Sequence, residues 1–203
     1  MKSKTLILIL IMLVSTSSIT PLSAVSGDEA VARFRAKMNS TQKLAGNISW
    51  TTANGTMFTG TFRYMRPGKI HVRFSSPFNR TIVSNGKRLW IHDSASNICA
   101  IQELGSNHSG GIAGMIRGYN ATASPGDGGY IIRLSAPNRT FSEIVLNVDN
   151  SFMLKRALLR RANGDTMVFT LNPSESVGSI SAGTFDFIPP SNAQVIMNPL
   201  DIR

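Results

Sequence analysis

Few side chains in this 203-residue sequence are spaced for catalysis or metal binding. The histidines, His71, His92 and His108, form no H-E-x-x-H motif, and the chain has no G-x-S-x-G elbow, no P-loop and no G-x-G-x-x-G turn. His71 falls on the polar side of an expected strand, and His92 stands beside Asp93 where another strand should end, so we expect both at the surface or in turns. The sequence therefore predicts a binding protein, not an enzyme, and implies no metal and no cofactor.

The single cysteine, Cys99, lies in the apolar run Ile98-Cys99-Ala100-Ile101. A lone cysteine cannot form an internal disulfide, so the domain must be stable through burial alone. No histidine or second cysteine stands at a spacing that would activate the thiol. We expect Cys99 to be a small buried hydrophobe in a strand.

The elements that would position a site are clearest in residues 58–93, where apolar and polar residues alternate at period two. The apolar members are Phe58, Phe62 and Tyr64, then Ile70, Val72 and Phe74. Arg66-Pro67 separates the two groups, because proline has no N–H to donate and forces the preceding residue toward extended or turn geometry. Asn85-Gly86 is a strong hairpin signal, with Trp90 on the strand that follows. The stretch predicts three or four consecutive antiparallel strands with a shared apolar face.

The first 24 residues predict a cleaved signal peptide. Lys2 and Lys4 precede an apolar run at residues 6–14, and small and polar residues follow as far as Ala24. The run is too short to span a bilayer comfortably. Cleavage is expected after Ala24 or Ser26, and a retained membrane anchor is the alternative. Residues 25–203 should then form a single soluble, monomeric domain in the periplasm.

The composition is basic, with 21 Lys and Arg against 11 Asp and Glu. Such a surplus attracts acidic partners, anionic lipid headgroups or nucleic acids. The arginines, however, are scattered along the expected strands, neither gathered in a tract nor interleaved with exposed aromatic residues. Export from the cytoplasm also argues against nucleic acid, so we expect no nucleic-acid partner.

An N-terminal helix is expected over residues 28–44. Asp28 is a suitable N-cap, and Val31, Phe34 and Met38 follow at helical spacing. Gly46 should mark its end.

A second helix is expected over residues 110–119. Ile112, Met115, Ile116 and Tyr119 stand at i, i+3, i+4 and i+7. Nearby glycines lower the intrinsic stability of this helix, so it needs a partner surface. Two interpretations stay open, a core helix with loose ends and a mobile lid.

The remaining chain reads as short antiparallel strands divided by turn residues. Besides those in residues 58–93, strands are expected at 47–52, 56–64, 97–103, 129–136, 140–148, 152–161, 166–171 and 184–188. A sheet of about ten or eleven strands cannot stay flat, and its concave face needs cover. We therefore predict a mainly β fold with α (α+β), a curved, unclosed antiparallel β half-barrel covered by a helical lid over an apolar space. The expected cavity lining is Phe34, Met38, Phe58, Phe62, Tyr64, Ile70, Val72, Phe74, Trp90, Ile112, Met115 and Ile116.

Four motifs carry a resemblance to a known family. They are G-T-F-x-Y-x-R-P-G-K-I, S-S-P-F and I-V-S-N-G-K-x-L-W-I within residues 60–91, and F-D-F-I-P-P at residues 185–190. In this order they resemble the periplasmic outer-membrane lipoprotein carrier proteins of the LolA type, and the resemblance covers essentially the whole mature chain. The chain departs from the family at Arg63 and Val72, where members often have an aromatic residue and a tryptophan, so the cavity lining and the cargo can differ.

The resemblance implies that the space between sheet and helices receives the acyl chains of a lipoprotein. The cargo would pass from an inner-membrane ABC transporter to an outer-membrane acceptor. The resemblance also assigns lid gating to Arg66, whose family counterpart ties the lid to the sheet in the closed state. A guanidinium suits this role because it can hold several backbone carbonyls reversibly. An ordinary surface arginine at a strand end is the alternative.

Three functions remain open from the sequence. The first is a periplasmic carrier of lipoproteins, and the second is an exported general binder of lipids or hydrophobic ligands on the same scaffold. The third is a basic β-rich domain that binds polyanions or serves in adhesion, with a filled core.

The chain also holds more N-x-S/T sequons than roughly three, the number its composition would give by chance. They begin at Asn39, Asn47, Asn54, Asn79, Asn107, Asn120 and Asn138. Drift of composition in a polar-rich bacterial chain is one explanation. The other is a glycosylating host without an outer membrane, in which transfer between membranes would be the wrong role.

Overall fold

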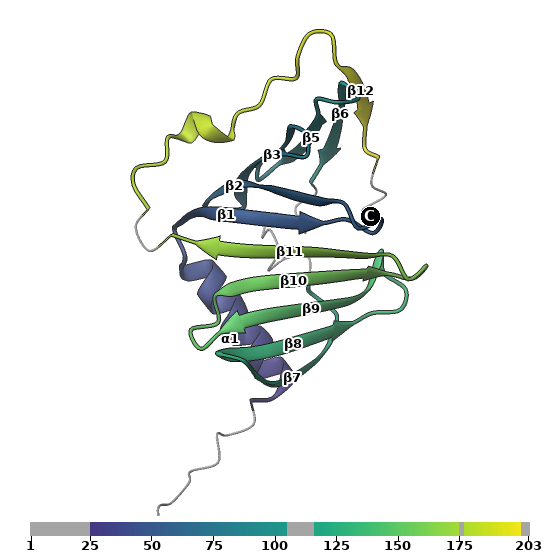
Figure 1. Cartoon of the computed structure of the whole chain (residues 1–203). Helices are drawn as coiled ribbons and strands as arrows, with labels where there is room; N and C mark the ends of the chain where they lie inside the picture. The colour runs from purple at the N-terminus through teal and green to yellow at the C-terminus, as the bar shows by residue number, and fades with distance from the viewer. Residues whose placement is uncertain (1–24, 105–115, 175–176, 200–203) are drawn as a thin grey trace, which may run out of the picture.

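Within the described residues of the computed structural model, 25–104, 116–174 and 177–199, twelve strands form one sheet (Figure 1). Their order is β12-β6-β5-β4-β3-β2-β1-β11-β10-β9-β8-β7, and neighbours are antiparallel except β12 and β6, which are parallel. The strands are β1 (Lys43–Thr51), β2 (Met57–Met65), β3 (Lys69–Ser76), β4 (Arg80–Asn85), β5 (Arg88–Asp93), β6 (Ile98–Glu103), β7 (Asn120–Gly126), β8 (Gly129–Ser135), β9 (Phe141–Asp149), β10 (Leu154–Arg161), β11 (Thr166–Pro173) and β12 (Gln194–Met197).

The sheet consists of two meanders joined by a single ladder. Strands β1 to β6 pair in chain order, as do β7 to β11, and β1 pairs with β11 to unite the halves. The edge strands β7 and β12 do not pair with each other, so the sheet stays open. The prediction of an unclosed antiparallel half-barrel with helical cover is confirmed, with twelve strands instead of ten or eleven.

Helix α1 (Gly27–Ser40) differs at both ends from the expected helix. Ser26, not Asp28, is the N-cap, and its hydroxyl accepts a hydrogen bond from the Glu29 backbone N–H at 3.2 Å. At the other end, the Thr41 hydroxyl and backbone N–H both donate to the Lys37 carbonyl, at 2.8 and 3.0 Å. The helix therefore ends before Gly46, which lies inside β1.

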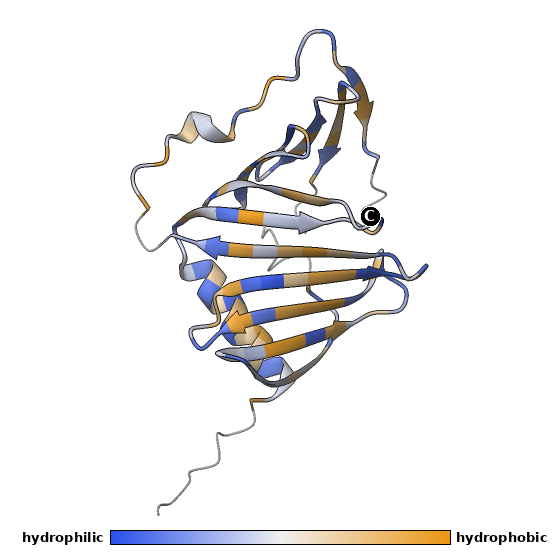
Figure 2. Ribbon diagram, viewed as in Figure 1, coloured by the Kyte–Doolittle hydropathy of each residue, from blue (hydrophilic) through white to orange (hydrophobic). Residues whose placement is uncertain are grey.

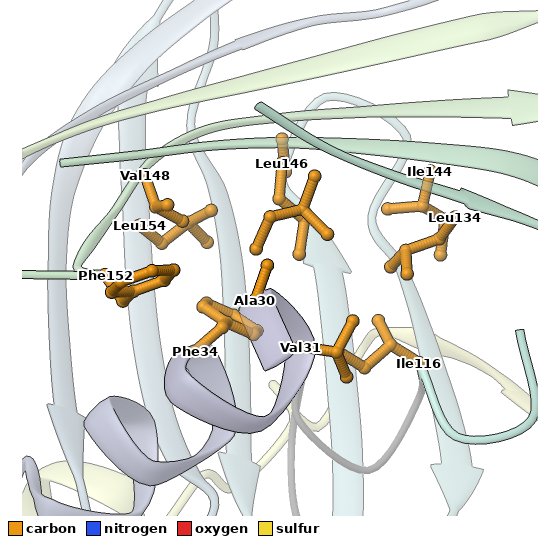
Figure 3. Close-up of a cluster of buried hydrophobic side chains, with 12 residues drawn as sticks. Ala30, Val31, Phe34, Ile116, Leu134, Ile144, Leu146, Val148, Phe152 and Leu154 are labelled. Atoms are coloured by element: carbon orange, nitrogen blue, oxygen red, sulfur yellow. The ribbon is translucent and has the colours of Figure 1, made fainter. Parts of the chain in front are cut away.

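One face of α1 packs on the β7–β11 half of the sheet (Figure 1). Ala30, Val31 and Phe34 point from the helix into a cluster of strand side chains, shown in Figure 3. We call the sheet face that α1 covers the inner face, and the opposite face the outer face. The buried members of this helix-side cluster are Ala30, Val31, Phe34, Ile116, Ile132, Leu134, Ile144, Leu146, Val148, Phe152, Leu154 and Ala157.

The inner face continues across the sheet by register, because directly paired residues share a face. Ala157 pairs with Phe169, Phe169 with Trp50, and Trp50 with Phe58. The alternation of hydrophobic and hydrophilic residues that makes two distinct faces is visible along the strands in Figure 2. A second cluster follows on this face, which we call the aromatic cluster. Its buried members are Ile48, Phe58, Phe62, Val72 and Phe74, and Leu44, Trp50, Ile70, Phe78, Ile82, Phe169 and Leu171 pack against them partly buried.

Gly60 allows β2 and β3 to approach closely in the middle of the aromatic cluster. A Cβ at Gly60 would lie 2.0 Å from the Arg73 carbonyl oxygen and 2.7 Å from the Phe74 Cα. The β2–β3 register shifts between Thr59 and Gly60, as at a β-bulge. Phe58 and Phe62 flank this glycine on the inner face.

The C-terminal segment packs on the outer face. The turn η2 (Ala182–Phe185) contacts β3 and β4 with Phe185 fully buried, and Phe187 packs against the buried cluster of Val83, Trp90 and Cys99. The strand expected at residues 184–188 is wrong, because these phenylalanines bury their rings against the sheet without joining its ladder. The chain then adds β12 to the edge strand β6.

The structure also differs from the expectations at the end of the predicted second helix and just after it. Residues 116–118 form a turn, and β7 begins at Asn120, where no strand was expected. The rest of the expected helix, with Ile112 and Met115, lies outside the described residues, as do the predicted signal peptide at residues 1–24 and the sequon at Asn107. No helix of the described chain is both long enough and apolar enough to cross a membrane.

Candidate lipid-binding face

The structure gathers half of the predicted cavity residues on one part of the inner face. Phe58, Phe62, Val72 and Phe74 are buried in the aromatic cluster, and Ile70 packs against them. Tyr64 belongs to the same face, because it pairs with Leu44 on one side and Ile70 on the other. Strands β2 and β3 therefore present the apolar surface that their alternation predicted.

Three other predicted residues lie on α1 or directly beneath it. Phe34 and Ile116 are buried in the helix-side cluster, and Met38 packs against it. Leu171 contacts both clusters, so the two are neighbours on one face. Phe34 and Ile116 are thus core residues that attach the cover to the sheet.

Trp90 lies on the outer face, which corrects its place in the predicted lining. It pairs with Val83 and Ile101 and packs with Cys99 and Phe187. Strand β5 has apolar residues on both faces, and its inner-face positions are Leu89 and Ile91, which follow from the Ile82–Ile91 pair. Trp90 therefore holds the C-terminal segment and does not contact the aromatic cluster.

The sequence reasoning missed Trp50, Phe78 and Phe169. The Trp50 ring stacks on Phe58 and on Phe169, with centroids 5.1 and 5.7 Å apart, and Phe58 meets Phe78 edge to face at 4.9 Å. The sequence could have revealed Trp50, because it stands two residues after the apolar Ile48 and therefore lies on the same face of β1, the strand next to β2. Phe78 follows the cis Ser76–Pro77 bond and carries no periodic signal.

Much of the aromatic cluster lies beyond the reach of α1. The cluster has no member from α1 among the described residues, and the helix contacts β7 and β8 most closely. Trp50, Phe78, Ile82, Phe169 and Ile70 each keep part of their surface exposed. An apolar ligand can gain binding free energy here by covering that surface.

An ion pair interrupts this apolar surface at the end of β2 that contains Phe58. Arg80 at the start of β4 pairs in register with Asp93 at the end of β5, and the guanidinium donates to the carboxylate. Burial acts to raise the pKa of Asp93, but hydrogen bonds from Arg80 and from the Ala95 backbone N–H outweigh it and hold the pKa below its ordinary value. The sequence signal was available, because the hairpin around Asn85-Gly86 places residues 80 and 93 opposite each other.

Arg66 lies at the opposite end of β2 and is exposed. Its backbone N–H donates to the Gln42 carbonyl at 2.9 Å, and its charge opposes the burial that raises the pKa of Tyr64. The peptide bond from Arg66 to Pro67 is cis. The segment that Arg66 is expected to hold, with Ile112 and Met115, lies outside the described residues.

The two described histidines, His71 and His92, both lie on the outer face. Burial, together with the charges of Arg63 and Arg73, lowers the pKa of His71. Cys99 is fully buried, as expected, and burial raises the pKa of its thiol. In the described part of the chain, no three His, Cys, Asp or Glu side chains converge on a possible metal position.

A separate polar groove of about 450 Å³ lies on the outer face. Its walls are Asn47, Ile48, Ser49, Thr59, Gly60, Thr61, Ser75, Thr170 and Asn172. Seven of these nine residues carry a hydroxyl or amide group, so an acyl chain bound here would cover polar groups without replacing their hydrogen bonds to water. The six sequon asparagines among the described residues, Asn47 in this groove included, are all exposed.

Comparison with known proteins agrees with this architecture. The family model described as outer membrane lipoprotein carrier protein LolA matches residues 39–188. The chain is 24% identical over 198 residues to the outer-membrane lipoprotein carrier protein of Chromobacterium violaceum, covering 91% of this chain and 96% of that one. It is also 24% identical over 202 residues to the protein of that name from Pseudomonas fluorescens, covering 91% and 97%.

The solved structures agree at the level of the fold. An uncharacterised conserved protein from Thermus thermophilus superposes with a TM-score of 0.54 at 11% sequence identity, over 84% of this chain and 98% of that one. The family match spans most of the described sheet, from the end of α1 to the segment after η2. The chain therefore belongs to the outer membrane lipoprotein carrier protein LolA family.

Proposed function

We propose that this protein carries lipoproteins by binding their acyl chains on the inner face of its sheet. The observation that supports this most is the aromatic cluster, an apolar surface on an open sheet that α1 covers only in part. Each methylene of an acyl chain gains about 0.8 kcal/mol when it leaves water, so such a surface is sufficient to hold a long chain. The relatives named as lipoprotein carriers support the choice of cargo.

The proposal includes the route of the cargo. Residues 1–24 would direct export to the periplasm and be removed, leaving residues 25–203 as one monomeric carrier domain without enzymatic activity. An inner-membrane ABC transporter would deliver the lipoprotein, and an outer-membrane acceptor would receive it. Both partners follow from the family resemblance.

The test is direct extraction of the native protein. The protein would be purified from its own host under mild conditions, extracted with organic solvent and analysed by mass spectrometry. We expect an acylated peptide, because lipoproteins are the proposed cargo. Free lipid alone would favour the second candidate, a general lipid binder that uses the same aromatic cluster. Extracts without any lipid would contradict both and favour the polyanion-binding or adhesion domain.

Replacement of Arg66 by leucine tests the gate. If the guanidinium holds the lid in the closed, empty state, its loss favours the bound state, so we expect the folded variant to exchange a fluorescent lipid probe about ten-fold more slowly. Stopped-flow exchange with unlabelled lipid measures the rate. Arg63→Leu, on the outer side of β2 three residues before Arg66, is the matched control and should exchange normally. An Arg66→Leu rate equal to that of the wild type would show that Arg66 is an ordinary surface residue.

A further inference from the structure

A charged pair sits in the aromatic part of the inner face. The side chains of Arg80 and Asp93 are each only 19% exposed. The guanidinium carbon of Arg80 lies 4.6 Å from the Phe58 ring centroid, 5.1 Å from that of Trp50 and 5.4 Å from that of Phe78. The cation is therefore held among three rings of the surface proposed to bind acyl chains.

The two partners differ in how well their hydrogen bonds are satisfied. Asp93 accepts from Arg80 and from the backbone N–H groups of Ala95 and Ser96, at 2.9 and 3.4 Å for the last two. Arg80 has five N–H donors and uses one of them on Asp93. Among the described residues, its Nε and the indole Nε1 of Trp50 are both buried without a hydrogen-bond partner. The carboxylate oxygens of Asp93 both accept hydrogen bonds, whereas the Arg80 guanidinium keeps its Nε–H donor without a partner in the described part of the chain.

Unused donors in an apolar setting favour a ligand that brings an acceptor, because a buried donor without a partner is costly. The charge decides which acceptor fits. Arg80 and Asp93 together carry no net charge, so an anionic group beside Arg80 would also meet the Asp93 carboxylate. A neutral carbonyl oxygen can accept from Arg80 or Trp50 without that repulsion.

We propose that Arg80 and Trp50 form a polar subsite for the ester carbonyl at the head of a bound acyl chain, and that Asp93 makes this subsite select neutral acyl esters over free fatty acids. This inference rests on the proposed function. The subsite would fix where a chain begins on the inner face, with its methylenes lying over the aromatic cluster.

The experiment compares two probes that differ only at the head, a fatty acid with a fluorophore near its far end and the methyl ester of the same compound. Binding is titrated by fluorescence at neutral pH, where the acid is ionised. We expect the wild-type protein to bind the ester about ten-fold more tightly. Asp93→Asn leaves the Arg80 charge uncompensated, so it should reverse the preference toward the acid by a similar factor.

A double variant removes the subsite without leaving a buried charge unpaired. Arg80→Met/Asp93→Asn should bind acid and ester with equal affinity while keeping its circular dichroism spectrum. The control is Arg88→Met/Glu103→Gln, which removes another cross-strand ion pair of an arginine with an acid, on the outer face between β5 and β6. That variant should keep the wild-type preference.

The outcomes separate the subsite from the proposed function. Equal binding of both probes to the wild type, or no shift in Asp93→Asn, overturns the subsite while lipid binding stands. Binding of neither probe overturns the proposed function and the subsite with it. If the subsite holds, competition of the bound ester by a diacylated peptide and by a diacylglycerol shows which source of ester carbonyl is preferred.

Discussion

Replacing Phe34 with alanine is expected to lower the free energy of unfolding by about 3–5 kcal/mol, the usual cost of removing a fully buried aromatic ring. Phe34 is the largest side chain that α1 contributes to the helix-side cluster, and it has no exposed surface (Figure 3). Its loss leaves a cavity between helix and sheet that rigid strands cannot close. Urea denaturation followed by circular dichroism measures the change.

The control for this variant is on the same helix. Ala36 is exposed, and Ala36→Ser should change stability by no more than about 0.5 kcal/mol, the difference in helix propensity. A small effect at both positions would mean that α1 is held to the sheet by contacts other than Phe34. A large effect at Ala36 would point to a surface that buries the opposite side of the helix.

Replacing Ile70 with glutamine is expected to weaken binding of an uncharged fluorescent acyl ester by about thirty-fold or more. Ile70 is partly exposed beside the aromatic cluster, so it can contact a ligand without forming the centre of the core. The substitution removes apolar contact worth about 1–2 kcal/mol and places an amide under the acyl chain, which costs about 1–3 kcal/mol more. Fluorescence titration gives the dissociation constant.

Arg73→Gln provides the matched comparison, since it introduces the same side chain on the same strand at an exposed outer-face position. Its affinity for the ester should equal that of the wild type. Equal weakening by both variants would indicate a general loss of structure. Unchanged affinity of Ile70→Gln for the ester would mean that the acyl chain binds elsewhere than on β3.

Local signals predicted the first meander well. The parity of Phe58, Phe62 and Phe74 determined which side of β2 and β3 faces the core, and Asn85-Gly86 located a hairpin. Such features depend on neighbouring residues, so they can be read from a single chain. The same hairpin also places Asp93 opposite Arg80, and this pair was missed because the prediction relied on apolar positions alone.

Two of the errors came from contacts between distant segments, and a third from local capping of a helix. Trp90 was assigned to the wrong face because β5 is apolar on both sides, and only Phe187, far along the chain, shows that the outer side is also covered. The phenylalanines of residues 184–188 suggested a strand by alternation, yet they pack on a sheet whose ladder is already complete there. The end of α1 was misjudged because Thr41 and Ser40 both cap its last turn, several residues before Gly46.

The ladder between β1 and β11 determines when the inner face becomes complete as the protein folds. Apart from the small edge strand β12, every other ladder links strands adjacent in the chain, so each closes a short loop and can form early. The β1–β11 ladder links strands that are far apart in sequence, so closing its loop costs more conformational entropy and we expect it to form later. Phe169 of β11 reaches Trp50 only through this ladder. Until β11 has joined β1, the aromatic cluster therefore lacks Phe169 and Leu171, and the apolar surface of the inner face is completed only when the two halves of the sheet meet.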